Sequence, residues 1–251
     1  GLILNEGLQT IESYGFRRCE AMTGALNIPS TVTQLQSSAG DTNPFDECPF
    51  TSLSVAPTNP NYSDNSDDVL YNKSKTELIY SPSGVTSALT IPSSVTLIAN
   101  WAFHNSERTG TLTIPSSVTT INTGAFEGAN FTGDLTIPNT VTQIGVDTFE
   151  DCTGFAGSLT ISSGLVQLPF GSFKGCTNLS GTLTIPSSVT SMRGEAFRDC
   201  RGLTGDIIIP NSVTIIDRKV FLGCTGFDGI LVIPAGVTQI NWSAFHNCSS
   251  I

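Results

Sequence analysis

The sequence is poor in charge, and above all in positive charge. Only 13% of its 251 residues are charged, against roughly 25% in an average globular protein. Lys and Arg number 11 while Asp and Glu number 21, which gives a net charge of −10 at pH 7. Binding to a phosphate backbone or an anionic lipid surface needs clustered basic residues. We therefore expect neither nucleic acid nor a membrane surface as a partner.

Other features are missing as well. No apolar run approaches the ~20 residues of a membrane span, so we expect no membrane insertion. No secretory leader is visible, and because the chain opens abruptly at Gly1 we expect a leader or anchor to have been trimmed away. There are two His and no Cys-x-x-Cys pair, which leaves a catalytic triad and a zinc site unsupported. The sequence thus predicts no enzyme, no catalytic residue, no metal site and no cofactor.

What the sequence has in abundance is a repeat. An Ile, usually followed by Pro, recurs at positions 91, 114, 137, 161, 185, 209 and 233, in steps of 23 or 24 residues. We call this Ile the marker. Gly usually stands four residues before it, Val or Leu four after, Leu, Ile or Met seven after, and Phe twelve after. Agreement among several independent columns predicts a repeat architecture.

Each column has a physical reason. Leu183 and Ile185 flank Thr184, so alternation puts both on one face of a short strand. Pro186 cannot donate to a strand ladder and ends that strand. Phe197 fills the middle of the coil, on a tight turn or a single helical turn. One coil cannot bury enough apolar surface to offset the ordering of about 24 residues, so the coils must stack into a solenoid with a parallel sheet.

The N-terminal part departs from this frame. Residues 8–19 predict the second half of a coil, with Ile11 and Phe16 inward, and residues 53–55 predict a marker strand that lacks the usual spacing. Two insertions account for the extra length. Residues 37–46 delay the repeat Phe to Phe45, and residues 56–80 predict a β-hairpin that projects from the solenoid.

The motif L-T-I-P-S-S-V-T-x-I-x-x-x-A-F-x-x-C resembles the BspA-like leucine-rich repeat, most closely at residues 183–200 and 112–129. Residues 59–84 resemble a hairpin that this family often carries. The resemblance implies a right-handed leucine-rich-repeat solenoid, mostly β, with a concave parallel sheet of short strands backed by helical turns. We expect a single domain over residues 1–251 with repeats of 23–24 residues and a hairpin insertion at about 56–84.

The resemblance also implies a secreted or cell-surface protein of a host-associated bacterium, without catalytic residues or a cofactor. Several members of the family are adhesins or are presumed to bind host or bacterial partners. This chain departs from the shorter repeats of the family by an extra Thr-Gly before the strand, as at Thr204-Gly205, which we expect to widen each coil.

Three groups of residues invite a chemical role. The seven Cys each stand three residues after a repeat Phe, in a column that also accepts Ser106 and Ala129. Stacked side chains there would point parallel to one another, so we expect buried free thiols. His104 and His246 each follow a repeat Phe in distant coils and are predicted to be surface residues. Residues 64–68 lack the Gly and Glu of an EF-hand loop and predict a polar turn, with weak calcium binding as the alternative.

The candidate binding residues lie on the outer face of the marker strands. A run of Thr there also has a structural explanation, because Thr favours strands and stacks as a ladder. Outward Ile and Val near one end indicate a contact patch, or a surface covered by further chain or by a second copy. The candidates are Thr113, Thr136, Thr160, Thr184, Ile208, Ile230 and Val232.

These observations favour a non-enzymatic, secreted or cell-surface binding module. It would act in adhesion, or in recognition of a protein or glycan ligand, through the concave sheet or the apolar patch. Self-association through the C-terminal end is a further expectation. The alternative is a structural spacer or display scaffold within a larger surface protein.

Overall fold

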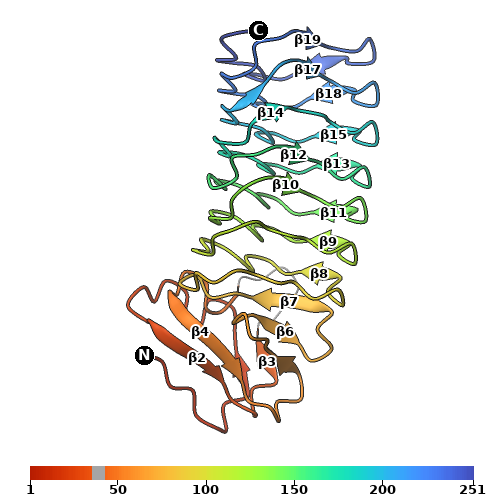
Figure 1. The fold of residues 1–251 in the computed structure, drawn as a ribbon. Helices are drawn as coiled ribbons and strands as arrows, with labels where there is room; N and C mark the ends of the chain where they lie inside the picture. The colour runs from red at the N-terminus through yellow and green to blue at the C-terminus, as the bar shows by residue number, and fades with distance from the viewer. Residues whose placement is uncertain (36–42) are drawn as a thin grey trace.

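The computed structural model describes residues 1–35 and 43–251. The repeat closes into coils that stack into a column (Figure 1), and strands of successive coils pair in parallel, as a solenoid requires. The strands are β1 Thr10–Ile11, β2 Gly24–Ile28, β3 Gln34–Leu35, β4 Phe50–Val55, β5 Tyr62–Ser63, β6 Leu70–Asn72, β7 Glu77–Tyr80, β8 Leu97–Ile98, β9 Thr120–Ile121, β10 Leu135–Thr136, β11 Gln143–Ile144, β12 Leu159–Thr160, β13 Gln167–Leu168, β14 Gly181–Thr182, β15 Ser191–Met192, β16 Leu203–Thr204, β17 Ile207–Ile208, β18 Ile215–Ile216, β19 Leu231–Val232 and β20 Gln239–Ile240.

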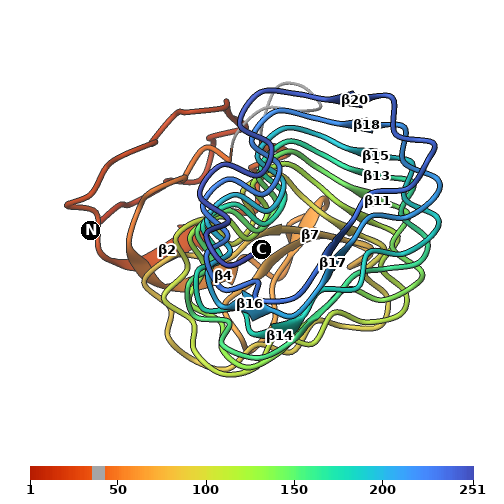
Figure 2. The ribbon, with the colours of Figure 1, turned by 90° about the horizontal axis from the view of Figure 1, so that it is seen from above.

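Each coil has two walls of strands, which are separated when the column is viewed along its axis (Figure 2). The marker wall holds the marker strands and breaks into two-stranded pieces, β2–β4, β10–β12, β14–β16 and β17–β19. The second wall holds the strands that end seven residues after the marker. It forms longer sheets, β11-β9-β8-β7-β6-β5 and β13-β15-β18-β20.

The marker wall is thus less continuous than the sequence predicts. Leu183 and Ile185 are buried and Thr184 is exposed, as expected, but these residues form no assigned strand. Pro186 removes a backbone donor directly after Ile185, which interrupts a ladder, whereas no Pro directly follows β15, β18 or β20 of the second wall. Gly181, with a positive φ of 75°, still pairs with Leu203 as part of β14.

The turns that close each coil are not helical. The residues that the structure describes contain no helix, so the predicted helical turns are wrong and the tight-turn alternative is confirmed. The coils from Phe103 to Phe245 have left-handed residues two before and two after the repeat Phe, such as Asp147 (φ 53°) and Asp151 (φ 54°) around Phe149. Two left-handed residues so close together interrupt the run of right-handed angles that a helix needs.

The second left-handed position alternates in chemistry from coil to coil. Asn and Asp tolerate positive φ better than most residues, and Gly tolerates it without cost. The Asn105, Asp151 and Asp199 side chains also lie against the Gly of the next coil: a Cβ on Gly223 would lie 2.5 Å from Asp199 Oδ1. Gly is therefore needed there for space as well as for φ. The series is Asn105, Gly128, Asp151, Gly175, Asp199, Gly223 and Asn247.

The core is a continuous stack of Phe rings. The ring centroids of neighbouring coils from Phe103 to Phe245 lie 5.1–5.7 Å apart, and the rings are within 13° of parallel. Rings such as Phe131 and Phe227 pack edge-on against the stack, a favourable aromatic arrangement. The stack fixes the coils in register.

The Cys column lines this stack and holds free thiols, as predicted. Each of six Sγ–H groups donates to the carbonyl oxygen of the repeat Phe in the preceding coil, at 2.9–3.0 Å. Burial raises the pKa of Cys48 to about 11, so its thiol stays protonated and unreactive at neutral pH. The buried thiols are those of Cys48, Cys152, Cys176, Cys200, Cys224 and Cys248, and Cys19 is half-buried.

The hairpin insertion is part of the column and does not project from it. Strands β6 and β7 pair antiparallel, as predicted, but β7 also pairs in parallel with β8 of the next coil. The prediction of a projecting hairpin is wrong because both of its faces are apolar and buried. One face (Val69, Tyr71 and Leu78) packs in the large C-terminal core cluster, and the other (Leu70, Ile79 and Tyr80) in a smaller N-terminal cluster.

The N-terminal coils otherwise follow the predictions. Strand β4 is the marker strand expected at 53–55, and it pairs in parallel with β2. Most of the insertion predicted at 37–46 lies outside the described residues. Phe45 at its end is buried and stacks on Phe16, with 5.7 Å between the centroids. None of the described segments forms a helix long and apolar enough to cross a membrane.

Candidate binding surfaces

The seven predicted binding residues all point outward, and all are exposed. On the marker wall, Thr136 is the register partner of Thr160, and Ile208 is the register partner of Val232. Alternation along each strand explains this, because the flanking frame residues face the core. The structure therefore supports their orientation, while binding through them stays a prediction.

The structure brings only some of these residues together. Thr184, Ile208 and Val232 line one open depression of about 660 Å³, whose floor includes Leu183 and Pro210. Thr113 and Thr136 line a separate, smaller hollow of about 280 Å³. Neither hollow includes Thr160 or Ile230. Thr184, Ile208 and Val232 thus form one apolar groove, and the other four candidates lie outside it.

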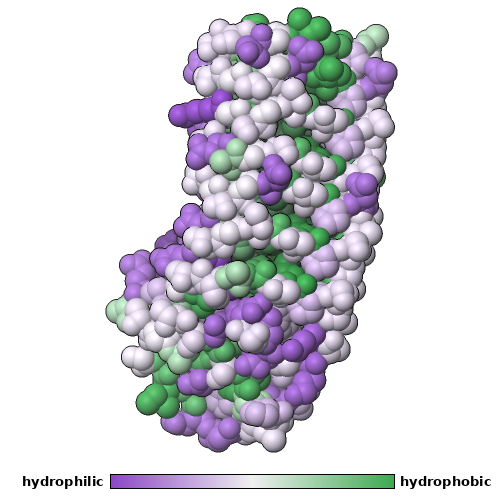
Figure 3. Space-filling view, viewed as in Figure 1, coloured by the Kyte–Doolittle hydropathy of each residue, from purple (hydrophilic) through white to green (hydrophobic). Residues whose placement is uncertain are grey.

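The groove lies beside one of the apolar areas of the visible surface (Figure 3). Ile208, Ile230 and Val232 are 55%, 63% and 38% exposed, and Figure 3 shows apolar surface gathered at the C-terminal end of the column, near β17 and β19. Ile233 and Ile240, which occupy inward columns of the frame, are also exposed there. They belong to the last coil that the structure describes.

A further surface on the second wall was missed by sequence reasoning. A hollow of about 380 Å³ is lined by Phe170, Arg193, Asp217 and Arg218, among others. A neighbouring hollow of about 220 Å³ shares Arg193 and Asp217 and adds polar side chains such as Gln239. These residues stand mostly eight or nine positions after the marker, in the columns whose residue type varies most from coil to coil. That variation was the available signal.

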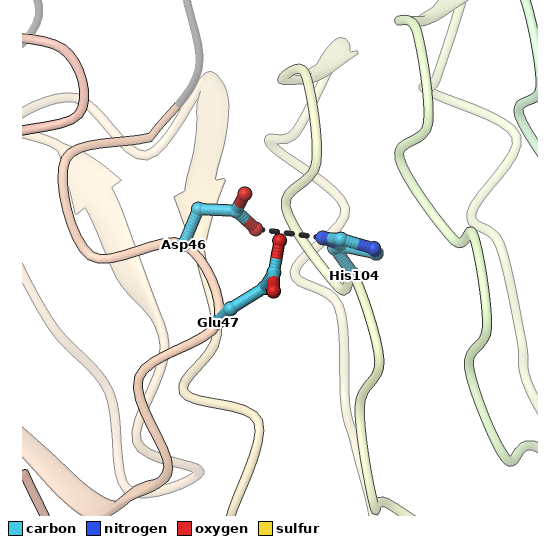
Figure 4. A group of neighbouring side chains, drawn as sticks. All are labelled: Asp46, Glu47 and His104. Carbon is cyan, nitrogen blue, oxygen red and sulfur yellow. Dashed lines mark hydrogen bonds and ion pairs between the residues drawn. The ribbon is translucent and has the colours of Figure 1, made fainter. Parts of the chain in front are cut away.

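A network of ion pairs joins the N-terminal coils to the column (Figure 4). His104 Nδ1 lies 2.7 Å from Asp46 Oδ1. Arg17 donates to the other Asp46 oxygen at 3.1 Å and to Glu47 at 3.2 Å, and Arg18 donates to Glu47 at 3.0 Å. The His104 side chain is only 11% exposed, so the prediction that it is a surface residue is wrong, whereas His246 is exposed as predicted.

Two effects compete for the protonation of His104. Burial alone would lower the pKa of the imidazole, but the hydrogen bond to Asp46 and the negative charges of Asp46 and Glu127 raise it, and the pKa ends above its ordinary value. The protonated ring is therefore stabilised in the fold. His104 links the segment around Asp46 to the coil that contains Phe103 through a charged hydrogen bond.

The same group has the donor types of a metal site. Among the described residues, only Asp46, Glu47 and His104 form such a group, with one ligand atom of each within 4.8 Å of the others. However, Arg17 and Arg18 already neutralise both carboxylates, so a divalent cation would add uncompensated positive charge. We therefore interpret the group as a structural ion-pair network.

The polar segment 64–68 is also structural. Carboxylate oxygens of Asp64, Asp67 and Asp68 accept backbone N–H groups of Val55, Thr90 and Leu53, at 2.9–3.2 Å. These bonds tie the turn to strand β4 on one side and to the segment around Thr90 on the other. The prediction of a polar turn is confirmed, and three carboxylates that would serve a calcium ion are engaged with the backbone.

Arg108 is a buried residue that sequence reasoning overlooked. It is 0% exposed and occupies a column, six residues before the marker, where later coils carry Phe or Leu. Its guanidinium donates to Ser81 Oγ at 2.8 Å, to the Ser87 carbonyl at 3.0 Å and to the Asp67 carbonyl. Arg108 thus fastens the hairpin segment to the column, and the break in an apolar column was its signal.

Comparison with known proteins shows which proteins share this architecture. A model of the BspA type leucine-rich repeat region matches residues 1–88, 85–204 and 155–251, in six copies. A leucine-rich repeat protein from Eubacterium ventriosum is 26% identical, with a TM-score of 0.78 over 97% of this chain. A leucine-rich cell surface protein from Faecalibacterium prausnitzii is 23% identical, with a TM-score of 0.59 over 99% of this chain. No curated protein matches the sequence.

This chain spans 63% and 62% of the lengths of those two structures. The second is less than 25% identical, so its likeness concerns the fold alone. The family model, in contrast, covers the chain from end to end. The strand, Phe and Cys columns described above are the residues that build the repeat in this chain. The chain therefore belongs to the BspA-type leucine-rich repeat family.

Proposed function

We propose that this chain is a non-enzymatic, extracellular binding module of a bacterial surface protein. It holds a protein or glycan partner by non-covalent contact, as in adhesion, through the groove between Thr184, Ile208 and Val232. The observation that carries the proposal is that groove, an open apolar depression on a mostly polar wall. Stacked repeats commonly present such extended surfaces to partners, and apolar patches with a polar surround are typical of interaction sites.

The family and the similar structures support this proposal at a coarser level. Leucine-rich repeats generally serve as interaction modules, and one similar structure is a cell surface protein. We also propose that the protein is secreted, that it acts in adhesion and that it has no enzymatic activity. We further propose that residues 1–251 form a single domain.

The test compares the groove with a matched apolar position on the other wall. The double variant Ile208→Ser, Val232→Ser removes the apolar contacts, and Val166→Ser, at an exposed residue of the second wall (57% exposed), is the control. An array of purified glycans and proteins measures binding, and sedimentation velocity measures self-association. We expect the double variant to lose ligands or self-association that the wild type and Val166→Ser retain. If the double variant keeps both, the groove is not the site.

A structural spacer is the second candidate. The uniform Thr positions of the marker wall and the unbroken Phe stack make a stiff column that could hold another domain away from a surface. Absence of any array ligand and of self-association in the wild type would favour this role over binding.

A further inference from the structure

The second wall carries an unusual pair of basic residues. Arg193 and Arg218 line the same hollow, on adjacent coils. The Arg193 side chain is exposed and has no hydrogen bond or ion pair to any described residue. The Arg218 guanidinium forms no ion pair either, and its Cζ lies 5.8 Å from the centre of the Phe170 ring. The protein has a net charge of −10, so two guanidinium groups without an ion pair at one hollow make a local concentration of positive charge.

The hollow is held in shape by a carboxylate that faces inward. Asp217 accepts the Gly194 and Arg218 backbone N–H groups at 3.1 and 2.7 Å, and the Asn241 amide at 3.1 Å. Burial alone would raise the pKa of Asp217, but these hydrogen bonds and the nearby positive charge of Arg218 lower it below its ordinary value. Both of its oxygens are engaged, so Asp217 positions the site and leaves the two guanidinium groups free for a ligand.

Gly194 opens the space between the two Arg residues. It stands in the column that elsewhere carries Phe170, Arg218 and Trp242. A Cβ at this place would lie 3.1 Å from Arg218 Cγ, so even Ala would crowd the Arg218 stem. Without a side chain at this coil, Arg218 extends across the gap to Phe170 and forms one rim of the hollow.

The remaining lining tells which anion would fit. Phe170 offers part of an aromatic face, and Gln167 offers an exposed amide. The adjoining hollow adds Ser191 and Gln239, whose side chains donate and accept hydrogen bonds. The Asn241 side chain also lies there, but it donates to Asp217 and accepts from Gln239. A ring with an apolar face, several hydroxyl groups and one acidic group matches this mixture of aromatic, amide and guanidinium groups. An acidic peptide would make fewer contacts with the amide groups and with the aromatic face.

We propose that these two hollows form a binding site for an acidic saccharide, which is distinct from the apolar groove on the marker wall. The guanidinium groups of Arg193 and Arg218 hold the carboxylate or sulfate group, Phe170 packs against the sugar ring, and the amide side chains bond its hydroxyl groups. The proposal rests on the proposed binding function in general but uses other residues on another wall.

The experiment is a calorimetric titration with three oligosaccharide probes, namely a polygalacturonate oligomer, a sulfated galactan oligomer and a neutral galactan oligomer of equal length. The variants are Arg193→Gln and Arg218→Gln. The control is Arg201→Gln, an exposed Arg that pairs with Asp199 elsewhere on the coil and gives the same change in net charge. Thermal unfolding of each variant verifies that the fold is intact.

We expect the wild type to bind at least one acidic probe, more weakly as salt rises, and not the neutral one. Each of Arg193→Gln and Arg218→Gln should weaken that binding about tenfold, the loss of one charge-assisted contact, while Arg201→Gln stays within about twofold of the wild type. The carboxylated and sulfated probes show which acidic group is preferred.

Three outcomes would overturn the proposal: no binding of either acidic probe, equal binding of the neutral probe, or unchanged binding by both Arg variants. Stronger binding of a poly-glutamate peptide than of either acidic saccharide would also overturn it, in favour of an acidic protein. The Ile208→Ser, Val232→Ser variant joins the same titration. Its unchanged saccharide binding is expected, so failure of the groove and failure of this site can be told apart.

Discussion

Replacement of Arg108 by Leu is the sharpest test of how the column is held together. The repeat alone predicts that Leu stabilises the fold at this position, because the same column holds Leu179 and Leu203 in later coils. The structure predicts a loss of stability, because Leu would leave the acceptors of Ser81, Ser87 and Asp67 without the donor that Arg108 provides. The two arguments predict opposite signs for the change in stability.

The magnitude follows from the acceptors that lose their donor. Ser81 Oγ would lose the Arg108 hydrogen bond in a buried place, and an unsatisfied buried polar group costs about 1–3 kcal/mol. The carbonyl groups of Asp67 and Ser87 lie in part-buried places, where water replaces the lost donor at a smaller cost. The variant also avoids burying a charge and gains apolar contact, which offset part of the loss. We expect the free energy of unfolding to fall by about 1–2 kcal/mol.

Urea unfolding measures the global effect, and hydrogen exchange localises it. We expect faster exchange of backbone amides in residues 81–90, where Ser81 N–H bonds the Ala102 carbonyl and joins the hairpin segment to the column. The control is Arg201→Leu, at an exposed Arg, which should change stability by less than about 0.5 kcal/mol. If Arg108→Leu is as stable as the wild type, with unchanged exchange, the acceptors are satisfied in another way and the reasoning fails.

The remaining predictions concern the turn ladder and the ion-pair network. Gly175→Ala should destabilise the fold by about 2 kcal/mol or more, measured by urea unfolding, because φ at Gly175 is 71° and the new Cβ would collide with Asp151 Oδ1. Adding Asp151→Ala to the same chain should restore part of the lost stability. A wild-type stability for Gly175→Ala alone would contradict the steric argument. His104→Gln should remove a pH-dependent part of the stability. Since the pKa of His104 is raised in the fold, its contribution is fully present below the ordinary histidine pKa of ~6.5 and is lost as the pH rises through the raised value. Thermal unfolding from pH 5 to pH 9 should therefore show the wild type gaining on His104→Gln toward acidic pH, whereas exposed His246→Gln should follow the wild type; parallel curves for wild type and His104→Gln would count against the network.

The regular part of the fold could be predicted from the sequence because its residues act locally and repeat. Leu183, Ile185 and Phe197 each recur at a fixed place in every coil, so the pattern of burial is repeated many times. The turn geometry could not be predicted in the same way. The Ala-Phe segment is compatible with a helix, and only the left-handed residues on either side, such as Glu195 and Asp199, exclude one. Non-Gly residues at positive φ carry no strong local signal.

The irregular parts depend on contacts between segments that are distant in the sequence. Apolar runs at 69–71 and 78–80 were compatible with an exposed hairpin, and their two-sided burial became evident only with the neighbouring coils in place. The pairing of His104 with Asp46 bridges 58 residues and crosses the insertion at 56–80. The outward direction of Ile208 and Val232 followed from alternation, but their union with Thr184 in one groove required the spatial arrangement of three coils.

The alternation of Gly with Asp or Asn along the tight turns has a consequence for how such a column can grow or shrink. Each acidic side chain rests on a coil that offers only Gly, so Asp151 and Asp199 are separated by two coils, about 10 Å at ~4.8 Å per coil. Removal of a single coil would place Asp on Asp, with two carboxylates at half that distance, or leave two Gly facing each other. Removal of two coils would preserve the order. The repeat that the sequence displays has 23 or 24 residues, but the unit that can be duplicated or deleted without a clash of charges is a pair of coils.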